Sequence, residues 1–162
     1  MIIKSYEIKN INFLKNNFYL FYGENEGFKN QIIKKKLEDF FKGNIFRYEE
    51  SEILNNKEIF FEKVYIKSFF DAEKLIIISR ATDKIKETIE EILEKKIKDT
   101  IIVLNSSVLD KKSKLRAFFE KNKYTICIPF YADNSQTLST ITKEFFREKE
   151  TSVSQETINL LI

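Results

Sequence analysis

The chain has 162 residues, of which 43% are hydrophobic and 33% are charged, a composition typical of a folded globular protein. Its 28 basic and 25 acidic residues nearly cancel to a net charge of +3, which argues against a strong electrostatic footprint for nucleic acid. With no histidine and one cysteine, the sequence excludes an internal disulfide, a nitrogen- and sulfur-rich metal site and histidine-dependent nucleophiles.

The amino terminus, Met1–Glu7, lacks the charged start, long apolar centre and cleavage site of a secretory signal. The apolar runs are far shorter than the roughly 20 residues that cross a bilayer. We therefore expect a cytoplasmic protein without a membrane span. Cys127 lies in the apolar run Ile126–Ile128, so we expect a buried thiol with no role of its own.

Apolar runs of strand length alternate with longer segments of helical period, which is the pattern of an α/β domain with a mainly parallel sheet. The predicted strands are Phe18–Tyr22, Ile45–Tyr48, Lys74–Ile78, Thr100–Leu104 and Thr125–Ile128. Three of them are nearly continuous hydrophobes, as in strands covered on both faces, so we expect these in the middle of the sheet.

The intervening segments are amphipathic and predict four helices, namely Phe28–Phe41, Ser51–Ile66, Lys84–Ile97 and Lys111–Lys121. We expect the first to be stopped by Gly43. The second should begin with Ser51 as its cap, without a capping box because Leu54 stands three positions on.

The pattern changes after Pro129, where Asn134–Glu150 and a segment from Ser152, with Ser154 as its cap, predict two more helices. We assign residues 1–138 to the α/β domain and residues 139–162 to the beginning of a small helical domain. Because the sequence stops on the apolar half-helix Asn159–Ile162, we expect a piece of a longer protein.

The turn after the first predicted strand lies where a phosphate-binding P-loop would be, with the pattern GxxxxGK[ST]. Gly23 and Lys29 have the spacing of that pattern, and Gly27 lies one position before its second glycine. Phe28 replaces that second glycine, however, and Asn30 replaces the hydroxyl residue that binds magnesium. The loop predicts the architecture of a nucleotide-binding domain with an inactive phosphate site.

The third predicted strand supports the same interpretation, because Ser79–Thr82 offers no pair of carboxylates for magnesium and water, and Asp83 lies past the strand end. An active AAA+-type P-loop ATPase remains the alternative hypothesis. Asn105–Ser107, after the fourth strand, stands where such proteins have a polar nucleotide sensor, and we interpret it as a turn.

Three segments together resemble one family, the delta subunits of bacterial DNA polymerase III clamp loaders. Phe18–Leu37 is similar to the family's "LxYGxDxF" stretch, although Gly27 precedes Phe28 here; Ser68–Ile78 resembles "LFxxxRLVVV", and Leu109–Leu115 resembles "LDKRSKL". The resemblance implies an AAA+-like parallel sheet flanked by helices, without nucleotide-binding residues, and then the start of a small helical domain. The family's third, collar-forming domain has no counterpart here.

The resemblance also implies a function: a non-catalytic subunit of the DNA polymerase III holoenzyme that binds the sliding clamp (beta subunit) through a hydrophobic wedge and helps open it in DNA replication. The matching wedge residues are Phe69 and Phe70, next to Ser68. Their position beside a buried strand alone would favour a place in the core. The family's other loader subunits would contact a part that has no counterpart in this chain.

The resemblance implies no cofactor, metal or catalytic residue in this chain, and only indirect or weak DNA binding. The lysine clusters 34–36, 95–98 and 111–116 could contact phosphates, but acidic residues lie near them. We interpret the clusters as solvated helix faces.

Overall fold

The computed structural model describes residues 2–3, 8, 11–13, 15–66 and 73–162. The chain divides into two compact units, Met1–Phe130 and Tyr131–Ile162. The first unit is built on a five-stranded parallel sheet in the order β2-β3-β4-β1-β5. Its strands are β1 (Phe18–Tyr22), β2 (Asn44–Glu49), β3 (Lys74–Ser79), β4 (Thr100–Asn105) and β5 (Thr125–Pro129).

All five predicted strands are confirmed, with ends that differ by one residue at most. Strands β3, β4 and β1 fill the middle of the sheet and are almost wholly buried, as continuous apolar runs predict. Strand β2 lies at one edge, and its residues are exposed or half-buried. The register sets Phe18 beside Ile102 of β4 and Thr125 of β5.

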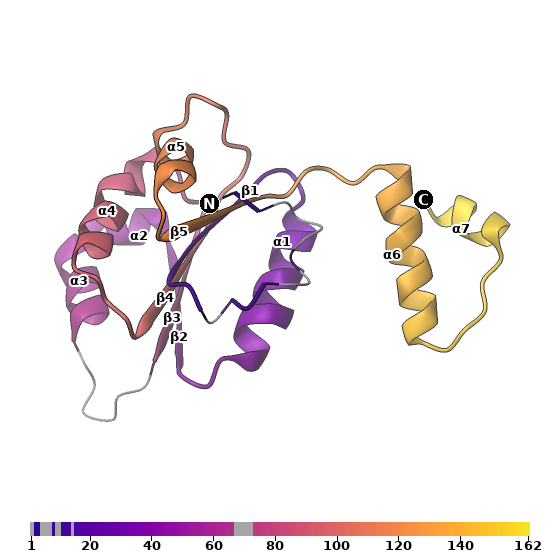
Figure 1. Ribbon diagram of the computed structural model, residues 1–162, viewed down its shortest axis with the longest axis horizontal. Coiled ribbons are helices and arrows are strands. Elements are labelled where there is room, and N and C mark those ends of the chain that lie inside the picture. Colours follow the sequence, from indigo (N-terminus) through magenta and orange to yellow (C-terminus); the bar gives the residue numbers. More distant parts are fainter. Residues whose placement is uncertain (1, 4–7, 9–10, 14, 67–72) are drawn as a thin grey trace. The chain divides into compact units, whose positions relative to one another are not determined.

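Each face of the sheet carries its own core because successive side chains of a strand point to opposite faces. Leu20 and Tyr22 join the core beneath helices α2 (Glu50–Asn55), α3 (Lys57–Tyr65), α4 (Lys86–Glu94) and α5 (Lys114–Lys121). Tyr19 and Phe21 join the other core, beneath α1 (Glu26–Ile32) and η2 (Ile33–Leu37). Figure 1 shows α1 on one side of the sheet and α2, α3, α4 and α5 on the opposite side.

The amino-terminal residues also take part in the second core, which the sequence did not reveal. Ile3, Ile8 and Phe13 are buried there. Ile2 forms a parallel bridge with Cys127, and the backbone amide of Ile3 donates to the Cys127 carbonyl oxygen at 3.0 Å. The outer edge of β5 is therefore partly covered. Cys127 itself is buried, and its desolvation raises the pKa of the thiol to about 12.

Two predicted helices prove to be composite. The segment predicted as one helix over Phe28–Phe41 begins earlier as α1, continues as the π-helical turn η2 and ends in the 3-10 turn η3 (Glu38–Phe40). The segment predicted over Ser51–Ile66 is α2 and α3, separated at Asn56. Asn56 has non-helical dihedral angles, φ −141° and ψ 57°, a conformation that asparagine tolerates well.

The predicted cap of this helical segment was wrong. Glu49, and not Ser51, caps α2, and a capping box with Glu52 is present because the Glu49 amide donates to the Glu52 carboxylate at 2.6 Å. The prediction failed because it placed the cap two residues too late. The helix predicted from Lys84 begins as the 3-10 turn η4 (Asp83–Ile85) before α4.

The second unit contains two helices, α6 (Ser135–Glu148) and α7 (Gln155–Leu161). Asn134 caps α6, and the predicted cap Ser154 is confirmed for α7. Ile158 is the only buried residue of this unit. The assignment of residues 139–162 to a small helical domain stays a prediction. In the described part of the chain, no helix has the length and apolar character needed to cross a membrane.

Candidate functional site

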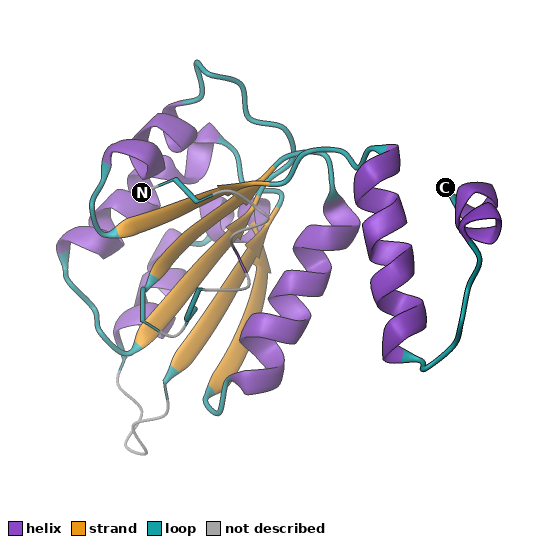
Figure 2. Cartoon of the chain, turned by 45° about the vertical axis from the view of Figure 1, so that its right-hand side comes forward, coloured by secondary structure: helices purple, strands orange, loops and turns teal. Residues whose placement is uncertain are grey.

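The candidate site lies where β1 and β4 end side by side. β1 leads into α1 on one face of the sheet, and β4 leads towards α5 on the other (Figure 2). Open α/β sheets bind their ligands at such a point, because neighbouring connections diverge there and leave a crevice at the carboxyl ends of the strands. The sequence placed the phosphate-like loop at this edge.

The loop after β1 is shaped by contacts within the chain. Gly23 has φ 127°, and a Cβ atom there would lie 2.1 Å from the carbonyl oxygen of Phe130, so no other residue fits without strain. The Gly23 amide donates to the carbonyl oxygen of Ser107 at 3.1 Å. Asn25 then caps α1 by accepting a hydrogen bond from the Phe28 amide at 3.0 Å. These contacts within the chain hold the strand, the turn and the helix together.

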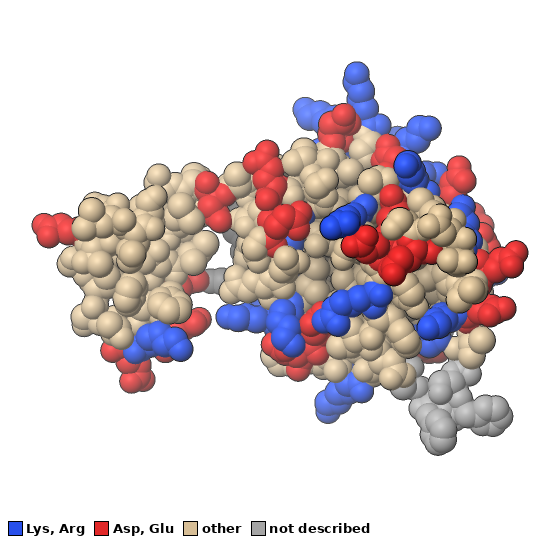
Figure 3. Space-filling model, turned by 180° about the vertical axis from the view of Figure 1, so that it is seen from behind, with Lys and Arg blue, Asp and Glu red and all other residues tan. Residues whose placement is uncertain are grey.

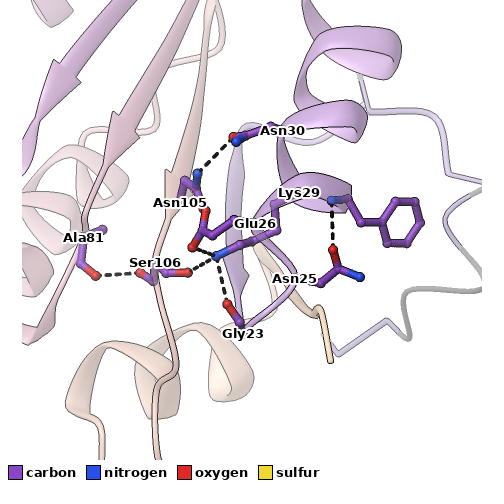
Figure 4. A network of polar contacts seen from close by, with 9 residues as sticks. Gly23, Asn25, Glu26, Lys29, Asn30, Ala81, Asn105 and Ser106 are labelled. Carbon is purple, nitrogen blue, oxygen red and sulfur yellow. Dashed lines mark hydrogen bonds and ion pairs between the residues drawn. The ribbon is translucent and has the colours of Figure 1, made fainter. Parts of the chain in front are cut away.

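Lys29 is the central residue of this edge and is fully buried. Its ammonium group donates to the carbonyl oxygen of Gly23 at 3.0 Å, to the carboxylate of Glu26 at 2.6 Å and to the carbonyl oxygen of Ser106 (Figure 4). An ammonium group has three protons, so these acceptors use its full donor capacity. The lysine that would reach a phosphate in a working loop instead joins the ends of β1 and β4.

The other predicted loop residues lie around Lys29 in different ways. Asn30 is exposed, and its side-chain oxygen accepts a long hydrogen bond, 3.5 Å, from the side-chain nitrogen Nδ2 of Asn105. Gly27 is exposed on the first turn of α1, and a Cβ atom there would make only an ordinary contact, 3.9 Å from the side-chain oxygen of Asn25. The ring of Phe28 packs edge-on against Phe130, with 5.4 Å between the ring centroids. Phe28 therefore fills a place in the fold where a P-loop glycine would leave the backbone open.

Ser106 was interpreted as part of a turn, and the structure gives it a larger role. Its hydroxyl donates to the carbonyl oxygen of Ala81 at 2.7 Å, and its amide donates to the carbonyl oxygen of Phe21 at 2.8 Å. With the contact to Lys29, this buried serine joins the ends of three strands. Sequence alone carried no signal for this, because a polar residue after a strand is typical of any loop.

The carboxylates near this edge serve as acceptors for the backbone. Glu50 is buried and accepts from the amide of Thr82 at 2.7 Å and from its hydroxyl at 2.9 Å. Asp83 accepts from the Ser113 hydroxyl at 2.6 Å and the Leu115 amide at 2.9 Å at the start of α5. Within the described ranges, no three histidine, cysteine or acidic side chains are placed to hold a metal ion.

These contacts change the pKa of Asp83. Desolvation raises the pKa of its carboxyl group, but the hydrogen bonds from Ser113, Leu115 and Lys114, with the nearby Lys114 charge, outweigh it, so the pKa lies below the ordinary value. Residues of the segment Leu109–Leu115, which resembles the family's "LDKRSKL", thus have a structural role at the start of α5. Ser113 caps α5 and also binds Asp83.

At the amino edge of the sheet, Lys74 begins β3 next to the end of α3. Its ammonium group donates to the carbonyl oxygens of Lys63 at 2.6 Å and Ile66, at the helix end, where a positive charge is favourable. Desolvation lowers the pKa of Lys74. Gly43 fits closely here, because a Cβ atom on it would lie 1.9 Å from the carbonyl oxygen of Glu73.

The hydrogen bond from Lys74 to the carbonyl oxygen of Ile66 therefore joins the two sides of the segment that contains the predicted wedge. The wedge residues Ser68, Phe69 and Phe70 lie outside the described residues, so their role stays a prediction. The sequence placed Lys74 at the start of a strand and at the basic position of the stretch that resembles "LFxxxRLVVV", and it gave no sign of the contacts with α3.

No family model matches the chain, and no curated protein matches it in sequence. Solved structures match it in fold. The Bacillus subtilis DNA clamp loader delta protein (YqeN) is similar with a TM-score of 0.67 and 13% identity, over 96% of this chain and 51% of that one. The fold is AAA+-like.

A second AAA+-like structure is also similar, the replication initiator DnaA bound to AMPPCP and single-stranded DNA. It matches with a TM-score of 0.54 and 16% identity, over 96% of this chain and 52% of that one. The chain thus spans about half the length of each of these proteins. The likeness to the clamp loader delta protein agrees with the family that the sequence resembles.

Proposed function

We propose that this chain belongs to a non-catalytic clamp-loader subunit of the delta kind, which binds the sliding clamp and helps open it during DNA replication in the cytoplasm. The observation that carries the proposal is the fold likeness to a clamp loader delta protein over 96% of the chain. The three motifs that resemble the same family support it independently of the fold.

The occupied state of Lys29 supports a role without ATP hydrolysis. A triphosphate at this edge would have to compete with the Glu26 carboxylate and two backbone carbonyl oxygens for the ammonium group. Breaking such a buried network leaves acceptors unsatisfied and is costly. Asn30 offers no hydroxyl for magnesium. The alternative, an active AAA+-type ATPase, has no such support.

In this proposal, Phe69 and Phe70 form the wedge that enters a hydrophobic pocket of the clamp, with Ser68 beside them. Two adjacent aromatic side chains present a large apolar area, and such anchors typically dominate the binding energy of an interface. If the wedge binds an opened clamp better than a closed one, binding alone shifts the population towards the open ring. Other loader subunits, and DNA only indirectly, complete the assembly.

The proposal is tested by calorimetry with the clamp of the same organism. We expect the wild-type chain to bind and the variant Phe69→Ala with Phe70→Ala to lose on the order of 100-fold in affinity, as for two hot-spot side chains. Phe40→Ala is the matched control, because Phe40 is 66% exposed in the described part of the chain. A folded double variant that binds the clamp as tightly as wild type would refute the wedge.

The same instrument separates the alternative function. We expect no magnesium-dependent heat of binding when ATP is titrated into the chain. Magnesium-dependent ATP binding that Lys29→Met abolishes would instead favour an ATPase.

A further inference from the structure

Helices α4 and α5 lie next to each other on the same face of the sheet (Figure 1). Between them is an open groove of about 480 Å³. Its lining combines three basic side chains with an aromatic and a small residue: Lys86 from α4 and Lys114, Ala117, Phe118, Lys121 and Asn122 from α5 and its end. The groove shares none of its lining residues with the contacts of Lys29.

The groove side of α5 differs from its two other sides. Leu115 and Phe119 are fully buried in the core. Arg116 and Glu120 form an ion pair at 2.8 Å. The groove side carries Lys114, Phe118 and Lys121, which share a face because they are four and three positions apart. An aromatic ring between two lysines on a solvent-facing stripe combines an apolar contact with positive charge.

Phe118 is half-buried and packs edge-on against the ring of Phe119, with 5.7 Å between the centroids. The ammonium group of Lys86 lies 5.5 Å from the centroid of the Phe118 ring. Part of the ring still lines the groove. The exposed part of the Phe118 ring can therefore contact an apolar side chain, while the ammonium group of Lys86 already lies against another part of the ring.

The charge of the groove is incompletely balanced. Lys86 pairs with Glu90 at 2.6 Å. Lys114 and Lys121 are exposed, and neither makes a close ion pair with a residue that the structure describes, although the charge of Lys114 lies near the Asp83 carboxylate. The excess positive charge is local, since acidic and basic side chains are interspersed over the face of the molecule in Figure 3. Charge complementarity therefore calls for a short anionic partner.

We propose that the groove between α4 and α5 binds a short acidic segment of a partner protein, with an apolar side chain against Phe118 and carboxylates on Lys114 and Lys121. These lysines are seven residues apart on the helix, which corresponds to about 10.5 Å along its axis. In an extended peptide, acidic residues three positions apart lie about 10 Å from each other. The spacing suits a segment in which two acidic residues flank an apolar pair.

Nucleic acid fits this groove less well. Its affinity depends on neutralising many phosphates along a continuous basic track, which two unpaired lysines do not provide. Binding of single strands also needs an aromatic face on which bases stack, and Lys86 lies over the ring of Phe118. The inference goes beyond the proposed function and does not depend on the sliding clamp.

The test uses a fluorescein-labelled hexapeptide in which acidic residues flank a central Leu-Phe pair, titrated with the whole chain and followed by fluorescence anisotropy. We expect saturable binding that Lys114→Glu with Lys121→Glu weakens at least about tenfold, the size of effect expected from reversed charges in an interface. The matched control is Lys35→Glu with Lys36→Glu, two exposed lysines of η2 on the opposite face of the sheet. It should leave the affinity unchanged.

Three results would overturn the proposal. The first is that the hexapeptide does not bind at millimolar concentration. The second is that the control variant weakens its binding as much as the groove variant does. The third is that a short single-stranded oligonucleotide binds through Lys114 and Lys121 more tightly than the peptide. Circular dichroism of both variants establishes that a loss of binding does not come from unfolding.

Discussion

At the carboxyl edge of the sheet, Lys29 is fully buried and its ammonium group binds Gly23, Glu26 and Ser106, all near in space and all from this chain. At the amino edge, the half-buried Lys74 binds carbonyl oxygens at the end of α3. The first lysine closes a position where related folds bind a ligand. The second fastens the ends of a segment proposed to bind a partner.

The difference teaches that the same type of side chain can join the ends of two strands or the end of a helix and a strand, depending on the acceptors around it. A lysine in a phosphate loop binds phosphate only while its N–H groups are free to donate to it. Here the N–H groups of Lys29 already donate to the surrounding acceptors. A lysine at the end of a helix adds order at low cost, because the helix end has carbonyl groups without partners.

The largest effect is expected from Lys29→Met. The substitution leaves the buried carbonyl oxygens of Gly23 and Ser106 without their donor, so we expect the free energy of unfolding to fall by about 3 kcal/mol in chemical denaturation. Lys36→Met, at an exposed position of η2, is the control and should change it by less than about 0.5 kcal/mol. A stability loss no larger than the control's would mean that Lys29 does not hold the two strand ends.

Lys74→Met should have an intermediate effect. Losing the donor for the carbonyl oxygens of Lys63 and Ile66 is expected to lower the free energy of unfolding by about 1 kcal/mol. Because the two ends of the segment with Phe69 and Phe70 are then no longer joined, we expect clamp affinity to fall about tenfold by calorimetry. Lys74→Arg keeps the charge and the donors and should restore both. Unchanged clamp binding by Lys74→Met would separate this lysine from the wedge.

The smallest effect is a pH dependence at the carboxyl edge. The folded pKa of Asp83 is lowered, so its carboxylate contributes stability above its ordinary pKa of about 3.9 and loses it as the pH falls through the lower folded value. Because Asp83 is exposed and solvent screens its charge, we expect Asp83→Asn to be only about 0.7 kcal/mol less stable than wild type at neutral pH, with a difference that shrinks in acid.

The control for this prediction is Asp39→Asn. Asp39 is exposed and pairs with the exposed Lys34 at 2.9 Å, so its substitution should change stability by less than about 0.5 kcal/mol. A difference between wild type and Asp83→Asn that stays constant as the pH falls would contradict the role given to the carboxylate.

The strands could be predicted because burial on both faces selects continuous apolar runs such as Ile101–Leu104, and no helix among the described residues contains such a run. The helix breaks could not. Asn56 separates α2 from α3 through its own dihedral angles, and the amphipathic pattern runs across it unchanged. The π-helical turn after Ile32 likewise keeps Ile33 and Leu37 buried, so the apolar spacing gave no sign of it.

The candidate site was predictable in its position and not in its contacts. Gly23 and Lys29 followed from the loop pattern, which also predicted that the phosphate site lacks essential parts. The three acceptors of Lys29 come from positions up to 77 residues away, and such pairings depend on the order of strands in the sheet. Ser106 and Lys74 act through backbone carbonyl groups, which leave no trace in the sequence.

The strand order has a consequence for synthesis of the protein. β1 is made first, but Phe18 pairs with Ile102 and Thr125, so this apolar strand stays without neighbours until most of the α/β unit has left the ribosome. Contacts between residues so far apart in the sequence slow folding and prolong the exposure of hydrophobic segments. A nascent chain paused before β4 therefore presents Phe18–Tyr22 as a natural binding stretch for a chaperone.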